Sequence, residues 1–153
     1  MLNVGIVGYG NVGREVEIEL KNNKNFNLIA IFDVKNAKNV VNYSKIKNYV
    51  GKIDLLFLCV GSKSDLQVVA LDLIKDFCLI DCYDNHAELK NYVEQMDTLS
   101  KKNKKVCLCA FGWDPGLFSF MRGLSSSLNL LPFTFWGKGI SQGHTQAIKN
   151  ITG

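Results

Sequence analysis

Leu2-Asn3-Val4-Gly5-Ile6-Val7, followed directly by Gly8-Tyr9-Gly10-Asn11-Val12-Gly13, decides the fold of this chain. The first six residues form a mostly apolar run of strand length, and the next six have the spacing G-x-G-x-x-G. That spacing is weak evidence alone, but here it follows a predicted strand and opens a predicted helix at residues 11–21. The combination predicts the phosphate-binding turn of a βαβ dinucleotide-binding unit; a glycine-rich turn without a ligand is the alternative.

Apolar runs and helical patterns alternate along the following residues. Strands are predicted at 27–32, 53–60, 77–82 and 106–110, with a weaker one near 40–43. Helices are predicted at 64–74, with Ser64 to Gln67 as a capping box, and at 85–99, with Asn85 and Glu88 as caps. Short connections between such elements are typical of a doubly wound parallel sheet. We therefore predict an α/β, Rossmann-type dinucleotide-binding domain at residues 1–117, with residues 118–153 forming a connector and the beginning of a second, α+β domain.

Composition favours one soluble globular core. The chain has 153 residues, of which 47% are hydrophobic and 21% charged, with a net charge of +4. These values exclude a disordered or fibrous protein, and no apolar run approaches the ~18 residues of a membrane span. The N-terminus lacks the pattern of a signal peptide, so we expect a cytoplasmic protein. The basic run at 101–105 is interpreted as a solvated helix end rather than a basic patch, so we expect neither nucleic acid nor a membrane as a partner.

Five cysteines lie in apolar, strand-like segments: Cys59, Cys78, Cys82, Cys107 and Cys109. None forms Cys-x-x-Cys, and no histidine stands at zinc-ligand spacing from them. We expect buried, reduced thiols without a disulfide framework, which fits the cytoplasm, and no metal site.

Asp33 ends the second predicted strand, 20 residues after Gly13. A carboxylate there accepts hydrogen bonds from the adenine ribose and repels a 2′-phosphate, which favours NAD over NADP. Lys35 offers that phosphate a positive charge, although a flexible ammonium is weaker there than a planar arginine fork. The residues alone leave cofactor preference open.

Further polar groups follow the later predicted strands. The turn Cys59-Val60-Gly61-Ser62 could let backbone pass a nicotinamide, or could be a plain β–α turn. Asp84 follows the 77–82 strand, as a helix cap or as a site residue, and Asp114 follows the next strand. Carboxyl ends of neighbouring parallel strands meet at one edge, so these two carboxylates suit a cationic group such as a substrate ammonium.

Five motifs, in order along the whole chain, resemble those of the meso-diaminopimelate D-dehydrogenase family. They are Gly8-Tyr-Gly-Asn-Val-Gly13, Tyr83-Asp-Asn-His86, Phe111-Gly-Trp-Asp-Pro-Gly-Leu-Phe-Ser119, Thr134-Phe-Trp-Gly137 and Ser141-Gln-Gly-His144. The resemblance implies a homodimeric enzyme of lysine and peptidoglycan-precursor biosynthesis. Its reaction is the reversible, NADP-dependent oxidative deamination of the D-centre of meso-2,6-diaminopimelate to L-2-amino-6-oxopimelate, or tetrahydrodipicolinate after cyclisation, and ammonia.

The resemblance also implies site residues. Substrate would contact Asp84, Asp114, Trp136, Gln142 and Gly143. The cofactor would be surrounded by Tyr9, Gly10, Asn11, Val12, Asp33, Val34, Lys35, Cys59, Val60, Gly61, Ser62, Cys82, Tyr83, Asp84, Phe111, Gly112, Trp113, Asp114 and Pro115. His144 is a candidate by position, although a histidine in a turn more often has a structural role, and no residue is assigned as general acid or base.

Two features depart from the family. Asp33-Val34-Lys35 stands where the family has a Ser or Thr and two arginines for the 2′-phosphate, so we expect relaxed or altered cofactor use. Family members are also roughly twice as long, so the groups that grip the L-centre and most of the dimer interface are expected to be missing here. A catalytically incompetent NAD(P)-binding fragment is therefore the main alternative function, and another Rossmann oxidoreductase, such as a sugar or dihydrodipicolinate reductase, is a minor one. Apolar residues such as Phe118, Leu128, Leu130, Leu131, Phe133 and Phe135 would then be exposed.

Overall fold

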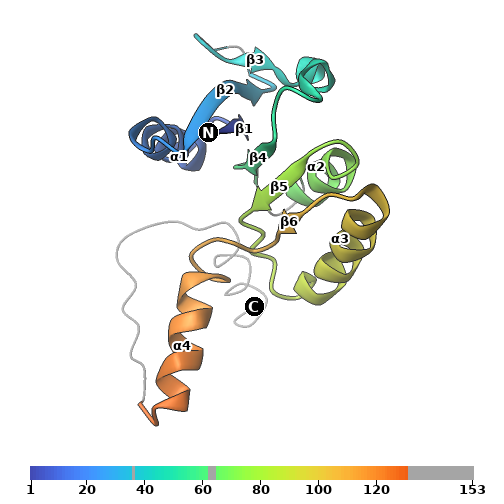
Figure 1. Cartoon of the computed structure of the whole chain (residues 1–153). Helices are drawn as coiled ribbons and strands as arrows, with labels where there is room; N and C mark the ends of the chain where they lie inside the picture. Colours follow the sequence, from blue (N-terminus) through green and yellow to red (C-terminus); the bar gives the residue numbers. More distant parts are fainter. Residues whose placement is uncertain (36, 62–64, 131–153) are drawn as a thin grey trace, which may run out of the picture.

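A six-stranded parallel sheet forms the centre of the computed structural model, which describes residues 1–35, 37–61 and 65–130 (Figure 1). Its strand order is β3-β2-β1-β4-β5-β6, which is the order of the doubly wound dinucleotide-binding fold. The strands are β1 (Leu2–Val7), β2 (Phe26–Asp33), β3 (Val41–Asn42), β4 (Leu55–Leu58), β5 (Cys78–Asp81) and β6 (Cys107–Leu108). All paired strands run parallel, so their carboxyl ends meet at one edge.

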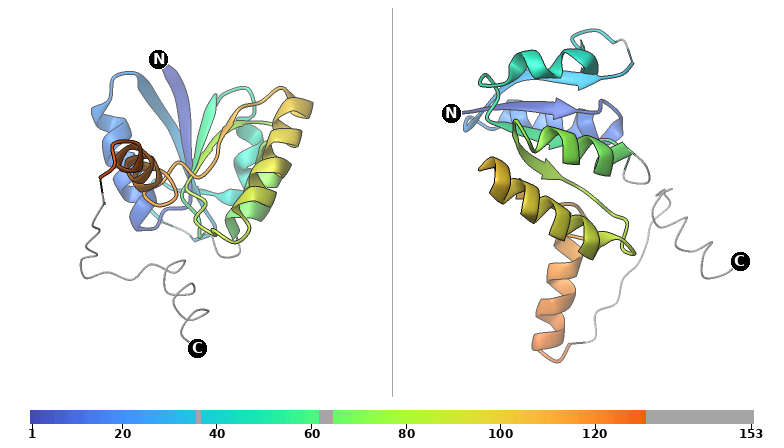
Figure 2. Two further views of the ribbon diagram at one scale, coloured as in Figure 1. Left: turned by 90° about the horizontal axis from the view of Figure 1, so that it is seen from below. Right: turned by 90° about the vertical axis from the view of Figure 1, so that its right-hand side faces the viewer.

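Helices cover both faces of the sheet. Helix α1 (Asn11–Asn22) lies on one face, and the 3₁₀ helix η1 (Tyr43–Tyr49) with α2 (Asp65–Leu73) and α3 (Leu89–Asn103) lies on the other (Figure 2). Each face has its own apolar core. Leu20 of α1 packs with Val4, Ile6 and Ile31, whereas the larger cluster under α2 and α3 contains Phe32, Leu56, Leu66, Leu79, Tyr92 and Met96.

The sequence-based prediction of the fold is confirmed: the chain has an α/β, Rossmann-type architecture. Strand β1 has the predicted bounds and β2 is slightly longer than expected, whereas β3, β4, β5 and β6 are shorter. The predicted strand at 106–110 is reduced to the two residues of β6, where Val106 and Leu108 are exposed because β6 is an edge strand. The predicted caps of α3 are wrong. The helix begins at Leu89, directly after its N-cap residue Glu88, and the Glu88 side chain makes no capping hydrogen bond.

Two further expectations concern charge and thiols. The basic run does end α3: the helix stops at Asn103, and Lys104 adopts the left-handed conformation at its C-terminus. None of the five cysteines, all of which lie in the described residues, forms a disulfide bond, and they are half-buried rather than fully buried as expected. Within the part of the chain that the structure describes, no helix has the length and hydrophobicity needed to cross a membrane.

Helix α4 (Leu117–Ser127) extends away from the sheet beyond its β6 edge (Figures 1 and 2). None of its residues is buried, and Phe120, Met121 and Leu124 are exposed. Leu128 and Leu130 are 60% and 58% exposed, which confirms the expectation for these two residues. Leu131, Phe133 and Phe135 lie outside the described residues.

Candidate functional site at the carboxyl edge of the sheet

The glycine-rich turn joins β1 to α1, and two of its glycines are required by the protein's own packing. Gly8 has a φ of +92°, and a Cβ there would lie 2.7 Å from the carbonyl oxygen of Cys59. A Cβ on Gly13 would lie 2.0 Å from the carbonyl oxygen of Gly8, so only glycine lets α1 approach the sheet this closely. Gly10 differs, because a Cβ there would meet no protein atom within 4 Å.

Gly10 is also the N-cap of α1, and its helix starts without a side-chain cap. The first backbone N–H groups of a helix have no partner within the helix, and the helix dipole makes this end positive. The turn therefore combines open space beside Gly10 with unpaired donors, which is the arrangement that accepts a pyrophosphate.

Asp33 holds the glycine-rich turn against the end of β2. Its carboxylate accepts hydrogen bonds from the backbone N–H of Tyr9 at 2.7 Å and of Lys35 at 2.8 Å. Partial burial alone would raise the pKa of Asp33, but the backbone N–H groups of Lys35, Tyr9 and Val34 outweigh it and lower the pKa. Asp33 is therefore an ionised carboxylate at the position where a ribose is expected.

Tyr9 is fixed from three sides. Besides its backbone bond to Asp33, its hydroxyl donates to the Glu17 carboxylate, and the guanidinium carbon of Arg14 lies 5.4 Å from its ring centroid. Lys21 pairs with Glu17 at 2.6 Å. The hydrogen bond to Glu17 is the main cause of a raised pKa of Tyr9, so the phenol stays protonated. The side chain of Tyr9 thus ties the glycine-rich turn to α1.

A cavity of about 320 Å³ opens beside Asp33. It lies between the ends of β1, β2 and β4 and the start of α2, and most of its lining is apolar. Its lining residues are Val7, Gly8, Phe32, Asp33, Val34, Tyr43, Val60, Asp65, Val68 and Val69. An apolar slot with an acid at its mouth has the chemistry of an adenosine site. Tyr43, Val68 and Val69 were not expected from the sequence, because no local pattern distinguishes an apolar side chain that lines a cavity from one that packs elsewhere.

The loops after β1, β4, β5 and β6 follow one another along the same edge. Gly8 lies against Cys59, and the thiol of Cys82 lies 3.6 Å from the carbonyl oxygen of Leu58. Cys82 in turn lies beside Gly112, where an added Cβ would be 3.3 Å from the Cys82 Cβ. The expected cofactor-binding segments that contain Gly8, Cys59, Cys82 and Gly112 therefore lie side by side.

Thiol chemistry at this edge is suppressed. Burial raises the pKa of Cys59 to about 12, and it also raises the pKa of Cys82, with the nearby Asp81 and Asp84 carboxylates adding to the effect. Both thiols stay protonated near neutral pH, so neither is suited to act as a nucleophile.

Asp114 has a protein partner in this structure. Arg122 of α4 grips both of its carboxylate oxygens, and Ser119 donates at 3.3 Å. The Asp114 side chain is only 9% exposed. The guanidinium holds the pKa of Asp114 below its ordinary range against the opposing effect of partial burial, and His86 adds to the lowering. Arg122 was not anticipated from the sequence.

A buried acid, Asp81, organises both loops. It is 1% exposed, and its Oδ1 accepts hydrogen bonds from the backbone N–H of Tyr83 at 3.0 Å and of Ala110 at 2.8 Å. Its Oδ2 accepts from the hydroxyl of Tyr92 on α3 at 2.6 Å. Its carbonyl oxygen accepts from the N–H of Phe111 at 2.7 Å. One residue thereby sets the positions of the segments that carry Asp84 and Asp114.

Several expected site residues lie outside the described part of the chain: Ser62, Trp136, Gln142, Gly143 and the candidate His144. The exposed Trp113 packs edge-on against Phe118, with ring centroids 4.7 Å apart. The turn that carries Asp114 is therefore folded onto the start of α4.

Strand order, glycine turn and the cavity beside Asp33 together define the class of this domain: it has the Rossmann-type, dinucleotide-binding fold. A family model described as the diaminopimelic acid dehydrogenase C-terminal domain matches residues 112–153. Over at least 99% of its length the chain is similar to meso-diaminopimelate D-dehydrogenases, of which it covers about half.

The comparisons give the extent of this homology. The chain is 37% identical to the meso-diaminopimelate D-dehydrogenase of Acetivibrio thermocellus, over 99% of this chain and 49% of that protein. A solved meso-DAPDH mutant from Clostridium tetani with DAP superposes with a TM-score of 0.85 at 39% identity, covering 100% of this chain and 50% of the other. An engineered D-amino acid dehydrogenase bound to NADP⁺ gives 0.84 at 34% identity, covering 99% and 50%. The chain therefore spans about half the length of the relatives it matches.

Proposed function

We propose that this chain supplies the cofactor-binding half, and part of the substrate site, of a meso-diaminopimelate D-dehydrogenase. The reaction would be the reversible, NADP-dependent oxidative deamination of the D-centre of meso-2,6-diaminopimelate to L-2-amino-6-oxopimelate and ammonia. The observation that carries the proposal is the 39% identity, over 100% of this chain, to a solved meso-DAPDH mutant with DAP. Lysine and peptidoglycan-precursor biosynthesis, a cytoplasmic location and a homodimer belong to the same proposal.

The residues at the carboxyl edge fit a dinucleotide. Open space beside Gly10 and the uncapped start of α1 would receive the pyrophosphate. The cavity beside Asp33 and Val34 would hold the adenosine. The segments at Cys59–Gly61, Cys82–Asp84 and Phe111–Pro115 would then border the nicotinamide, because they follow β4, β5 and β6 along the same edge.

Cofactor preference is the finer part of the proposal. A bound NADP⁺ in a related structure favours NADP. Asp33 opposes it, because its carboxylate, held at the end of β2 by the backbone N–H groups of Tyr9 and Lys35, would repel a 2′-phosphate bound there. We propose that the chain uses both NADP and NAD, with a smaller preference for NADP than an arginine fork would give.

Asp84 and Asp114 are the proposed partners of the substrate's D-centre ammonium. Asp114 is already ionised and already paired with a cation, Arg122. An ammonium arriving from the substrate would offer the same charge, so binding would exchange one cationic partner for another at Asp114. Trp136, Gln142 and Gly143 are proposed to complete the substrate site.

The protein's contribution to the chemistry is positional. A bound nicotinamide dinucleotide would supply the acceptor for the hydride that leaves Cα of the D-centre, and water would then release ammonia from the oxidised carbon. Asp81 fixes the two loops that would orient the ammonium, and the raised pKa values of Cys59 and Cys82 keep reactive thiolates away from this edge. The proposed boundary between residues 1–117 and 118–153 falls at the start of α4, close to Gly112, where the family-model match begins.

Two measurements test the proposal. Calorimetric titration of the 153-residue chain with NADP⁺ and NAD⁺ tests the cofactor half, and absence of binding by either would overturn it. A fusion of this chain to the C-terminal half of the Acetivibrio thermocellus relative tests the reaction. We expect NADPH formation with the meso isomer and none with the L,L isomer, which lacks a D-centre. A well-folded fusion that binds NADP⁺ but is inactive with the meso isomer would contradict the proposed reaction.

A further inference from the structure

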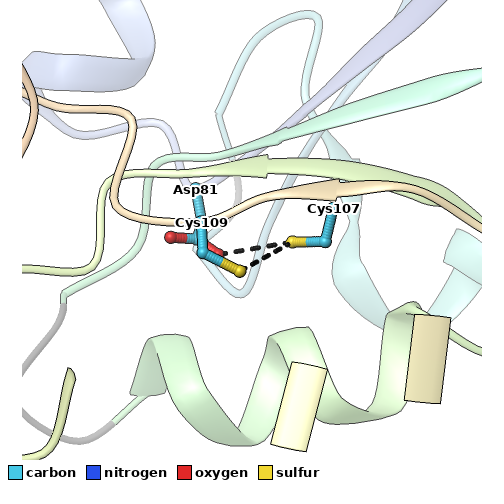
Figure 3. A group of neighbouring side chains, drawn as sticks. All are labelled: Asp81, Cys107 and Cys109. Atoms are coloured by element: carbon cyan, nitrogen blue, oxygen red, sulfur yellow. Dashed lines mark hydrogen bonds between the residues drawn. The ribbon is translucent and has the colours of Figure 1, made fainter. Parts of the chain in front are cut away.

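Two thiols and a carboxylate converge between the sheet and α3. Cys107 and Cys109 lie two residues apart at the end of β6, and Asp81 ends the neighbouring strand β5 (Figure 3). The Cys107 thiol lies 3.6 Å from Oδ2 of Asp81, and the Cys109 thiol lies 3.5 Å from the Cys107 sulfur. One ligand atom from each of the three residues lies within 4.8 Å of the others.

These separations are close to those of a tetrahedral metal site. With Zn–S bonds of about 2.3 Å and a Zn–O bond of about 2.1 Å, two sulfurs stand about 3.8 Å apart and a sulfur and an oxygen about 3.6 Å apart. Two of the three ligand separations thus already match to within a few tenths of an ångström. The third, between Cys109 and Asp81, needs a side-chain adjustment of about 1 Å or less, given its limit of 4.8 Å.

The charge of the cluster also suits a cation. Asp81 is 1% exposed, and the described lysines, arginines and histidines form no ion pair with it. Its donors, two backbone N–H groups, a phenol and a thiol, are all neutral. A buried carboxylate that has only neutral donors gains from a nearby cation, since burial of an unpaired charge is costly.

A metal could replace the hydrogen bond from the Cys107 thiol to Asp81 without breaking the hydrogen bonds that Asp81 makes to the two loops. Both backbone N–H groups bind Oδ1, whereas Cys107 donates to Oδ2. A metal on Oδ2 would replace the Cys107 proton and leave Tyr83 and Ala110 in place. Access is available from a cavity of about 580 Å³ between α3 and β6, which both cysteines line.

We propose that Asp81, Cys107 and Cys109 form a binding site for a thiophilic divalent cation, with Zn²⁺ as the principal occupant. Binding releases the two thiol protons to solvent and forms two metal–sulfur bonds and one metal–oxygen bond, while a water molecule from the cavity takes the fourth position. The site ties the end of β5 to the end of β6. This inference does not depend on the proposed function, since none of its three ligands holds the cofactor or substrate.

Cobalt is the probe that tests this site, because Co²⁺ takes the same geometry as Zn²⁺ and absorbs light. The reduced, metal-free chain of 153 residues is titrated anaerobically with Co²⁺. We expect a thiolate-to-cobalt charge-transfer band that saturates at one equivalent and disappears when one equivalent of Zn²⁺ is added. Cys109→Ser should weaken binding by more than about 100-fold, whereas the matched control Cys78→Ser, on β5 but outside the cluster, should bind as the parent does.

A second measurement uses the parent chain and needs no variant. In the parent chain, Zn²⁺ should protect Cys107 and Cys109 from alkylation, as seen by peptide mass spectrometry, while Cys78 should react equally with and without the metal. No charge-transfer band at stoichiometric Co²⁺, a band that persists in both Cys107→Ser and Cys109→Ser, or equal alkylation of all these thiols would each overturn the proposal.

Discussion

At the scale of single residues, Asp33 is expected to have a large effect on the preference between NADP and NAD. Replacing it with serine removes the ionised carboxylate beside the expected 2′-phosphate and keeps one acceptor for the N–H of Tyr9. We expect Asp33→Ser to raise the affinity for NADP⁺ relative to NAD⁺ by about tenfold or more, from the loss of a like charge at short range. Titration of both cofactors measures the ratio.

Asp54→Asn is a matched control for that change, because Asp54 also accepts a backbone N–H, from Asn3, but at the opposite end of the sheet. It should leave the ratio unchanged. A ratio that shifts equally in both variants would show that net charge, rather than the position of Asp33, sets the preference.

The ion pair between Asp114 and Arg122 predicts a pH effect. The folded-state pKa of Asp114 is lowered, first by Arg122. A lowered pKa stabilises the fold above the ordinary carboxyl range near ~3.9, and this stabilisation is lost as the pH falls through the folded-state value. Urea unfolding from pH 6 to pH 3 should therefore show a smaller acid-induced loss of stability in Arg122→Gln than in the parent. The difference should stay under about tenfold in the unfolding equilibrium, since Arg122 is well exposed. Parallel pH curves would contradict the pairing.

At the scale of elements, substitutions in the turn between β1 and α1 should distinguish effects on folding stability from effects on dinucleotide binding. In Gly13→Ala the new Cβ would lie 2.0 Å from the backbone of Gly8, so α1 must move from the sheet. We expect a loss of about 3 kcal/mol in the free energy of unfolding, measured in urea.

Gly10→Ala is the paired variant. Its Cβ enters open space, so stability should fall by less than about 1 kcal/mol, the difference between glycine and alanine at an N-cap. Dinucleotide binding should nevertheless weaken by at least about tenfold, because the methyl group occupies space expected for the pyrophosphate. Normal binding by Gly10→Ala would place the pyrophosphate elsewhere.

The sequence predicted the bounds of the central strand β1 better than those of the edge strand β6, for a physical reason. Leu2–Val7 is apolar almost throughout because β1 is covered on both faces, so its bounds could be read directly. Strand β6 is flanked by exposed Val106 and Leu108, so its apolar run exceeds its hydrogen-bonded length. Local patterns located Asp33 and the glycine turn. They could not reveal Arg122 as the partner of Asp114, or bring Asp81 to Cys107, because those pairs form only through tertiary packing.

At the scale of the whole molecule, we expect cofactor binding without substrate turnover. The described residues supply the cofactor edge and Asp84 and Asp114, while the relatives are about twice as long. We expect a polypeptide of these 153 residues to bind a dinucleotide but to show negligible diaminopimelate-dependent NADPH formation, because half of the substrate would be unheld. Robust turnover by the purified chain, with its mass verified, would contradict this.

The cavity beside Asp33 and the Asp114 turn lie over different strands of the sheet. The cavity is built from β1, β2, β4 and α2, whereas the turn follows β6 and is positioned by Asp81 of β5. Substitutions near Asp33 therefore leave the geometry around Asp114 untouched. We therefore expect substitutions near Asp33 to change cofactor preference without changing amino-acid recognition at the Asp114 turn.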